Sequence, residues 1–499
     1  MAITTNWLLD LLLATTLLFY LLYKYMTRNH DYWKIRGVPH KTPSPIIGNI
    51  WPVLSNQLSI GNFLRELHNS TNQPFLGFHT DRPALLIRDP ELSKTILVKD
   101  FQIFDNHSVL SGEKLDPILP HMLFFSRNPE WKQSRSKLTP VFSTGKLRAM
   151  CGLINEVGDN LLEHLSGFAE KGVIVDAKEV CNKFATDVIA SCFFGIDAKS
   201  FEDENAEFAA SVKKLFGTSW TTWVQQTSYF FAHTLAKCFG MRMFHPGTME
   251  FLTKAFSRTV GHREKSGFSR NDLIDFVIKM KENKEYVNEF NLNGDTIAAN
   301  AVQLFMAGLE TTSLTISFAL HELSMNKTIQ DKLRQEITQT LNTHNKIDYD
   351  TLKDMKYLDQ CVRETLRKYP AMPFVDRDCN STYTLPGTNV TIDKGTAIYV
   401  SLLGLHHDPQ YFPEPEKFDP ERFSGENKIS DAYIPFGNGP RICIGERLGV
   451  LNTKMAVARI ISKYEVIKTE KSRDPVIFDP RCPILKAADG IPVRFKKLE

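Results

Sequence analysis

The residues with the clearest capacity for chemistry occupy positions 436–445, which read FGNGPRICIG. A thiolate that ligates a metal needs a tight turn, backbone N–H groups that face the sulfur, and shielding from water. Gly437, Gly439 and Gly445 can provide the turn and the close backbone approach. The loop therefore predicts that Cys443 is a metal ligand. A buried structural cysteine is the alternative, because free cysteine is among the most buried residue types.

A second group of reactive side chains lies inside a long, weakly charged segment, residues 295–324, that predicts a buried helix. Residues 307–312 read AGLETT, which places an acid and two hydroxyls where burial is costly. A threonine hydroxyl can donate to the carbonyl four residues earlier and bend the helix, which leaves room for a small ligand. Glu310 and Thr311 are therefore candidate catalytic residues, and a helix kink without chemistry is the alternative.

A pair of opposite charges, Glu364 and Arg367, lies three residues apart in a predicted helix at 349–369, so the two side chains face one another. The E-x-x-R spacing carries little weight alone, because Glu470 and Arg473 repeat it. Its place in the chain is more informative. It lies between the long helix and the cysteine loop, and a PERF tetrad at residues 420–423 follows it.

Taken together, these motifs resemble those of the cytochromes P-450. The spacing F-x-x-G-x-R-x-C-x-G at 436–445 is similar to the haem-binding signature of that family. Residues 101–105, 112–117 and 131–142 resemble those of microsomal insect detoxifying members most, and vertebrate drug-metabolising relatives next. One departure is Ile442, because many relatives carry a polar residue immediately before the cysteine.

The resemblance implies a role for each motif. Cys443 would be the axial thiolate of haem b iron, while Thr311 would hydrogen-bond to oxygen and Glu310 would help to relay protons. Haem carries two propionates, which suit arginine forks and an indole N–H. The residues implied to hold the cofactor are Trp131, Arg135, Arg377, Arg441 and Phe436. A buried charge triad of Glu364, Arg367 and Arg422 would lock the scaffold.

The same resemblance implies an NADPH- and dioxygen-dependent monooxygenase that inserts one oxygen atom into lipophilic small molecules. These would be xenobiotics such as plant toxins or insecticides, or endogenous lipids or hormones. The aromatic residues implied to line the substrate pocket are Phe104, Phe124, Phe305 and Phe374, although each alone is more often core than contact. The rival interpretations are a non-oxidising haem carrier and a haem-thiolate isomerase, and the intact acid–threonine pair argues against both.

Electrons would have to come from a partner, because the sequence has no phosphate-binding loop and no dinucleotide fingerprint after a strand. The resemblance implies NADPH-cytochrome P-450 reductase, with cytochrome b5 as a second candidate donor. Basic residues near the cysteine loop would form a positive face for such an acidic flavoprotein. They are Lys132, Lys137, Arg441, Arg447 and Lys454, each of which could instead be an ordinary solvated charge.

The whole chain sets the frame in which these residues must be positioned. It has 499 residues, of which 42% are hydrophobic and 23% charged, and its net charge of +3 gives no basic field that would favour nucleic acid. Eight scattered cysteines favour reduced thiols over a disulfide framework. Helical periodicity dominates, so the predicted fold is mainly α with small β-sheets. The resemblance implies that this is a cytochrome P-450 fold, with the long central helix over the haem.

The N-terminal segment differs from the rest. Residues 7–23 are almost wholly apolar, and lysines and arginines follow the run but do not precede it. This predicts an uncleaved anchor at residues 1–25 with the rest of the chain in the cytoplasm. The resemblance to microsomal members implies that the membrane is that of the endoplasmic reticulum, with the catalytic domain facing the cytoplasm. A cleaved signal peptide is the alternative. Residues 26–50 would form a basic and proline-rich hinge, and residues 51–499 the haem-thiolate monooxygenase domain.

Overall fold

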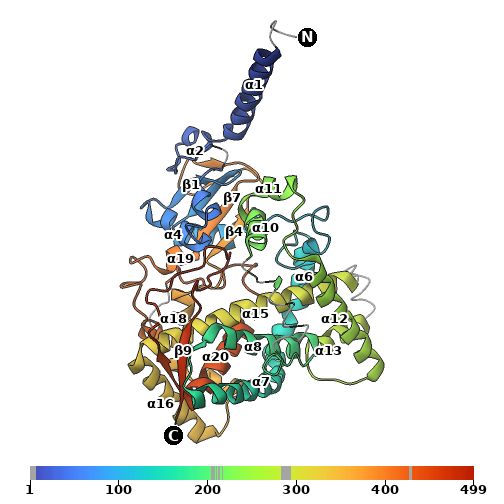
Figure 1. The fold of residues 1–499 in the computed structure, drawn as a ribbon, viewed down its shortest axis with the longest axis vertical. Coiled ribbons are helices and arrows are strands. Elements are labelled where there is room, and N and C mark those ends of the chain that lie inside the picture. The colour runs from blue at the N-terminus through green and yellow to red at the C-terminus, as the bar shows by residue number, and fades with distance from the viewer. Residues whose placement is uncertain are drawn as a thin grey trace.

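A computed structural model describes residues 7–45, 47–203, 208, 211, 214–215, 217, 219–282, 294–425 and 430–498. The chain is mainly helical with small sheets, which confirms the predicted fold class (Figure 1). The predicted apolar N-terminal helix is present as α1 (Trp7–Thr27), which projects from the body with its side chains largely exposed (Figure 1). It is long and apolar enough to cross a membrane.

A short helix, α2 (Tyr32–Ile35), joins this segment to the body. Trp33 is fully buried and donates its indole N–H to the carbonyl of Phe78 at 2.9 Å. The indole packs so tightly on the first strand that a side chain at Gly77 would lie 2.5 Å from its ring. The chain that follows α1 is therefore fixed to the main sheet.

The main sheet has four strands in the order β1-β2-β7-β4. The pair β2–β7 is parallel and the pairs β1–β2 and β4–β7 are antiparallel. A three-stranded sheet has the order β3-β9-β8, and β5 pairs antiparallel with β6. The strands are β1 (Phe75–His79), β2 (Pro83–Ile87), β3 (Val175–Asp176), β4 (Phe374–Asp378), β5 (Tyr383–Thr384), β6 (Thr391–Ile392), β7 (Ala397–Ser401), β8 (Tyr464–Lys468) and β9 (Pro492–Lys497).

The predicted long helix is α15 (Gly294–Met325), which runs through the middle of the helical body (Figure 1). It packs closely against α8 (Ala177–Ile189), because a side chain at Gly308 would lie 2.9 Å from Ile189. The glycine in the AGLETT motif therefore allows two helices to approach, which a larger residue would prevent.

The remaining described helical segments complete the body of the protein. They are α3 (Trp51–Leu54), α4 (Ile60–Asn69), α5 (Pro90–Lys94), η1 (Thr95–Lys99), η2 (Leu119–His121), α6 (Glu130–Leu138), η3 (Thr139–Phe142), α7 (Thr144–Lys171), η4 (Ala190–Phe194), α10 (Trp220–Phe231), α11 (His233–Cys238), α12 (Pro246–Ser266), α13 (Leu273–Glu282), α16 (Lys327–His344), α17 (Tyr349–Asp354), α18 (Lys356–Lys368), α19 (Leu402–His406), η5 (Pro420–Phe423) and α20 (Glu446–Lys463).

The prediction of one helix at 349–369 was wrong, because the chain breaks at Met355 into α17 and α18. Met355 is fully buried with an extended ψ of 90°. The new N-terminus of α18 is capped from outside, since the carboxylate of Glu336 on α16 accepts the N–H groups of Tyr357 and Leu358 at 2.7 and 2.9 Å. A cap supplied by another helix leaves no local sequence signal.

Candidate active site

The cysteine loop is held by its own backbone. The N–H of Cys443 donates to the carbonyl of Phe436 at 3.0 Å, and the N–H of Ile442 donates to the carbonyl of Gly439 at 3.0 Å. Gly439 has a φ of +75°, and a side chain there would lie 1.9 Å from the carbonyl oxygen of Leu97. The glycine is therefore required both by its left-handed conformation and by the neighbouring backbone.

Cys443 lies two residues before Gly445, the N-cap of α20, and the backbone N–H groups of Gly445 and Glu446 interact with its sulfur. Burial raises the pKa of the Cys443 thiol, while the backbone N–H groups of Gly445 and Glu446 and the guanidinium of Arg135 act in the opposite direction. Cys443 is exposed to the cavity, and a thiolate enclosed there needs a further positive charge, which a bound metal ion would supply. A side chain at Gly445 would lie 4.0 Å from the sulfur, so the glycine keeps the space beside it open.

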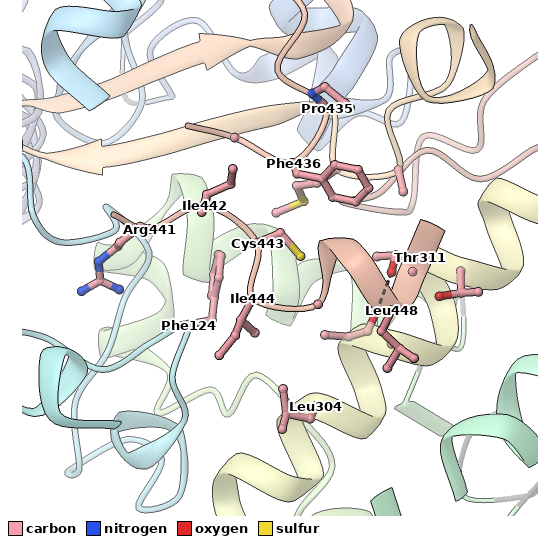
Figure 2. A pocket seen from close by; sticks show the side chains of 18 of the residues that line it. Phe124, Leu304, Thr311, Pro435, Phe436, Arg441, Ile442, Cys443, Ile444 and Leu448 are labelled. Carbon is pink, nitrogen blue, oxygen red and sulfur yellow. Dashed lines mark hydrogen bonds between the residues drawn. The ribbon is translucent and has the colours of Figure 1, made fainter. Parts of the chain in front are cut away.

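The sulfur faces an internal cavity of about 360 Å³ (Figure 2). One wall is the cysteine loop, and the opposite wall is α15 with Ala307, Gly308 and Thr311. Most of the remaining surface is apolar. It is contributed by Leu123, Phe124, Phe142, Phe193, Leu304, Leu366, Met372, Phe374, Val375, Phe436 and Leu448, among others.

Two buried arginines converge at one end of this cavity. Arg441 donates to the carbonyls of Asp105 and Ser126 at 2.5 and 3.0 Å, but its Nη1 has no partner among the described residues. Arg377 donates to the carbonyl of Asp376 at 2.7 Å, and its Nε atom also has no hydrogen-bond partner among the described residues. Burial lowers the pKa of Arg377 to about 10, and burial together with Arg377 lowers that of Arg441 to about 9.

These unpaired donors call for anions, because an unsatisfied buried charge is costly. Trp131 lies against the Arg441 guanidinium, 4.3 Å from ring centre to the central carbon, and it lines the cavity together with Arg135. Arg135 also donates to the carbonyl of Ile442 at 2.7 Å, which ties α6 to the cysteine loop. The set fits a flat apolar group that has two carboxylates and a metal held by Cys443, which is the description of haem.

His107 also lines the cavity, and the sequence interpretation missed it. Burial lowers the pKa of His107 to about 4, so the ring is neutral at neutral pH and donates from Nδ1 to Asp376 at 2.9 Å. Burial opposes the charge of Asp376, but His107 and Arg377 hold the pKa of that carboxyl at about 2. The His107 ring stacks on Phe124 at 4.1 Å and fixes this part of the wall. A loop histidine has no periodicity that could have revealed it.

On α15 the two predicted catalytic residues point in different directions. Thr311 lines the cavity and donates its hydroxyl to the carbonyl of Ala307 at 2.6 Å, which leaves its oxygen lone pairs free to accept (Figure 2). Glu310 does not line the cavity. The residue is 4% exposed, and its carboxylate pairs with the ammonium of Lys178 on α8 at 3.0 Å. The Lys178 ammonium also donates to Ser313 at 3.0 Å.

The predicted charge triad is brought together between α18 and the segment that contains η5. Glu364 and Arg367 are fully buried and form two hydrogen bonds of 2.7 and 2.8 Å. Arg422 approaches the same carboxylate at 3.4 Å. Arg367 also donates to the carbonyls of His406 and Pro415, both at 2.8 Å, so it joins three separate segments.

Of the four predicted pocket aromatics, Phe124 and Phe374 line the cavity. The prediction was wrong for Phe104 and Phe305, which are both 0% exposed and lie in the core. Phe104 packs on Tyr383 at 5.0 Å, and Phe305 packs on Phe194 and Phe208 at 5.3 and 4.9 Å. An aromatic residue in a pocket-forming segment can point to either side of its element.

The predicted basic face is also only partly formed. Lys132 and Arg447 are exposed. Lys137, Arg441 and Lys454 are buried, with exposed fractions of 3, 8 and 8%, and the ammonium of Lys454 is 2.6 Å from the carboxylate of Asp359. That part of the prediction was wrong, because sequence alone does not show which long basic side chains fold back into the protein.

Comparison with known proteins shows what this constellation belongs to. The family model described as Cytochrome P-450 matches residues 38–493. The chain is 39% identical to cytochrome P-450 6j1 of Blattella germanica over 482 residues, 95% of each chain. It is 36% identical to cytochrome P-450 6k1 of the same species, over 98% of this chain and 97% of the relative. The chain belongs to the cytochrome P-450 family.

A probable cytochrome P-450 6w1 of Drosophila melanogaster is 34% identical over 98% of both chains. The match extends over nearly the full length of these insect relatives, so membership of the family covers both walls of the cavity. As a cytochrome P-450 the chain is a haem-thiolate monooxygenase, as the sequence predicted. All of the residues predicted to hold the cofactor or its iron line the cavity: Cys443, Trp131, Arg135, Arg377, Arg441 and Phe436.

Proposed function

We propose that this cytochrome P-450 oxidises lipophilic small molecules, which are plant toxins, insecticides or other xenobiotics, or endogenous lipids or hormones. The observation that carries the proposal is the apolar wall of the cavity opposite Cys443, with Leu123, Phe124, Leu304 and Phe374. Such walls favour apolar ligands, because contact between the ligand and the wall removes apolar surface of both from water, which is favourable.

The residues around the cavity divide the work. Haem, when bound, supplies a redox-active iron at which dioxygen can be reduced and one of its atoms transferred. The apolar side chains bind and orient the substrate and exclude water. Thr311 can accept or donate a proton at its hydroxyl oxygen. Glu310 would exchange protons from the far side of α15, where it pairs with Lys178.

Electrons would come from NADPH through NADPH-cytochrome P-450 reductase, with cytochrome b5 as a second candidate donor. A depression of about 550 Å³ beneath the cysteine loop supports this part of the proposal. Its lining includes Lys353, Arg363 and Arg447 beside Asp359 and Glu446, so it offers charged groups to an acidic flavoprotein. We further propose that α1 anchors the chain in the endoplasmic reticulum membrane with the body in the cytoplasm.

The test reconstitutes the full chain with a P-450 reductase in phosphatidylcholine vesicles and supplies NADPH, ¹⁸O-labelled dioxygen and a panel of lipophilic compounds. We expect products that contain one labelled oxygen atom and form only when both NADPH and reductase are present. Unlabelled rearrangement products that form without NADPH would indicate an isomerase instead. Binding of haem with no product from any compound would favour a carrier.

A further inference from the structure

Two carboxamide side chains one turn apart on α15 hold the segment that carries Phe124. The Oδ1 atom of Asn300 accepts the backbone N–H of Leu123 at 2.9 Å. The Oε1 atom of Gln303 accepts the backbone N–H of Phe124 at 3.1 Å. A backbone N–H can only donate, so these contacts settle which end of each carboxamide is oxygen and which is nitrogen.

The two amides differ in what their NH₂ groups contact. The Nδ2 atom of Asn300 donates to the carbonyls of His121 and Thr296 at 3.0 and 2.8 Å, and the residue is 4% exposed. Its hydrogen-bonding capacity is used within the protein. Gln303 lines the cavity, and its NH₂ group has no hydrogen-bond acceptor among the residues that the structure describes.

The surroundings make this NH₂ group distinctive. Leu123, Phe124 and Leu304 form the adjacent apolar surface, and Figure 2 shows Phe124 and Leu304 at the same cavity. Thr311 and Thr315 on the same helix already donate their hydroxyls to the carbonyls of Ala307 and Thr311. In an apolar pocket, a donor without an acceptor discriminates strongly between ligands that supply one and ligands that do not.

Its position along the helix adds a geometric consequence. Gln303, Ala307 and Thr311 follow one another at intervals of four residues, so they share one face of α15. Eight residues of helix correspond to about 12 Å along the axis. A ligand atom held by Gln303 is therefore well separated from the part of the cavity between Thr311 and Cys443.

We propose that the Gln303 amide is a hydrogen-bond donor subsite that selects lipophilic substrates with an oxygen acceptor at one end, such as a ketone, ester, lactone or ether. Gln303 is thus a positioning residue, and oxidation occurs at a carbon remote from that oxygen. The inference rests on the proposed function, because it narrows the substrate class of the same cavity.

The test uses the purified, haem-loaded full chain and matched pairs of ligands. One such pair is 8-phenyloctan-2-one and octylbenzene. The two differ in a single carbonyl. Dissociation constants are measured from the shift of the haem absorption on ligand binding and checked by calorimetry. We expect the wild type to bind the ketone about two- to twelve-fold more tightly than the hydrocarbon, the range for one net hydrogen bond.

Three variants isolate the amide. Gln303→Leu should bring the ketone-to-hydrocarbon ratio close to one, with the hydrocarbon serving as the internal control for pocket integrity. Gln303→Glu keeps the acceptor for the Phe124 N–H but replaces the amide donor with a carboxylate. This variant should bind octylbenzene more tightly than the ketone. It should bind 7-phenylheptan-1-amine at least tenfold more tightly than octylbenzene. Gln335→Leu removes a carboxamide at an exposed position of α16, outside the cavity, and should leave the ratio unchanged.

A second readout is the site of oxidation in the reconstituted system. Wild type should oxidise the ketone at its phenyl end, and Gln303→Leu should spread the products along the chain. An unchanged ketone preference and product pattern in Gln303→Leu would overturn the subsite, while the proposed function would stand. If the wild type neither binds nor oxidises any member of any pair, both proposals fail.

Discussion

The two walls of the cavity are built in opposite ways. The wall that carries Cys443 comes from one loop, in which the cysteine N–H bonds to a carbonyl only seven residues earlier, at Phe436. The opposite wall is assembled from α15, the segment at 123–124 and β4, which are far apart in sequence. The wall that carries Cys443 therefore comes from one short segment, which Leu97 and Arg135 contact from outside. The wall that selects the ligand can change one residue at a time without disturbing the thiolate.

The sharpest test of the local wall is Cys443→Ser. We expect complete loss of the thiolate-type ferrous–carbon monoxide spectrum and of oxygenation, because a serine hydroxyl does not provide the electron-donating thiolate. Cys238→Ser, at an exposed cysteine on α11, is the control and should keep both. Retention of the spectrum in Cys443→Ser would remove the basis of the comparison.

Arg367→Leu tests the support beneath that wall. It leaves Glu364 buried with its main partner lost, and we expect a loss of about 3–5 kcal/mol in the free energy of unfolding. Urea denaturation monitored by circular dichroism measures it. Lys254→Leu breaks an ion pair with Glu250 on the exposed surface and should leave the midpoint unchanged. Equal effects of the two would show that the triad is not a lock.

Gly439→Ala tests whether the loop backbone sets the geometry. The positive φ and the contact with the Leu97 carbonyl predict a loss of about 2–3 kcal/mol in stability. Gly152→Ala, in an open position inside α7, should instead gain about 0.5–1 kcal/mol. Thermal unfolding distinguishes the two, and a neutral Gly439→Ala would contradict the local account of this wall.

Thr311→Val changes the opposite wall alone. We expect the carbon monoxide spectrum and hydrocarbon affinity to remain, while product formed per NADPH falls about tenfold, or about 1.4 kcal/mol, since water can replace the hydroxyl only in part. The measurement is product against NADPH consumed. A changed carbon monoxide spectrum would mean that the two walls are not separable.

The smallest expected effect is a pH dependence beneath the cysteine loop. Burial, and then Arg367, lower the pKa of His406 to about 3, and its Nε2 accepts the N–H of Ile434 at 3.1 Å. In the unfolded chain the His406 imidazole is protonated near pH 6.5, whereas in the native protein it is protonated only near pH 3. Stability from this group is therefore full above pH 6.5 and falls as pH decreases toward 3.

From pH 6.5 to 5.5 the His406 contribution amounts to about 1.4 kcal/mol or less. The slope of unfolding free energy against pH should flatten in His406→Gln and stay unchanged in His344→Gln, at an exposed position of α16. An identical slope in all three proteins would show that His406 is protonated in the native state.

The sequence predicted elements and motifs that rest on local patterns. The apolar N-terminal helix, the long helix from 294 to 325 and the glycine-rich turn all depend on residue types within one segment. Prediction from the sequence failed where contacts with another element determine the local structure. Glu336 caps a new helix after Met355, and Phe104 and Phe305 face the core. The sequence could have identified Gln303 as a cavity residue, because it lies on the same face of the long helix as Thr311.

By itself, the sequence determined the family and the class of reaction, and it predicted the metal ligand, because a cysteine in a glycine-rich turn is specified by ten consecutive residues. Only the tertiary structure decided which side of α15 Glu310 occupies, which aromatics face the cavity and where the free amide of Gln303 points. Those facts depend on which side chains meet across separate elements. Burial and hydrogen-bond satisfaction over the whole fold determine these contacts, and no local spacing encodes them.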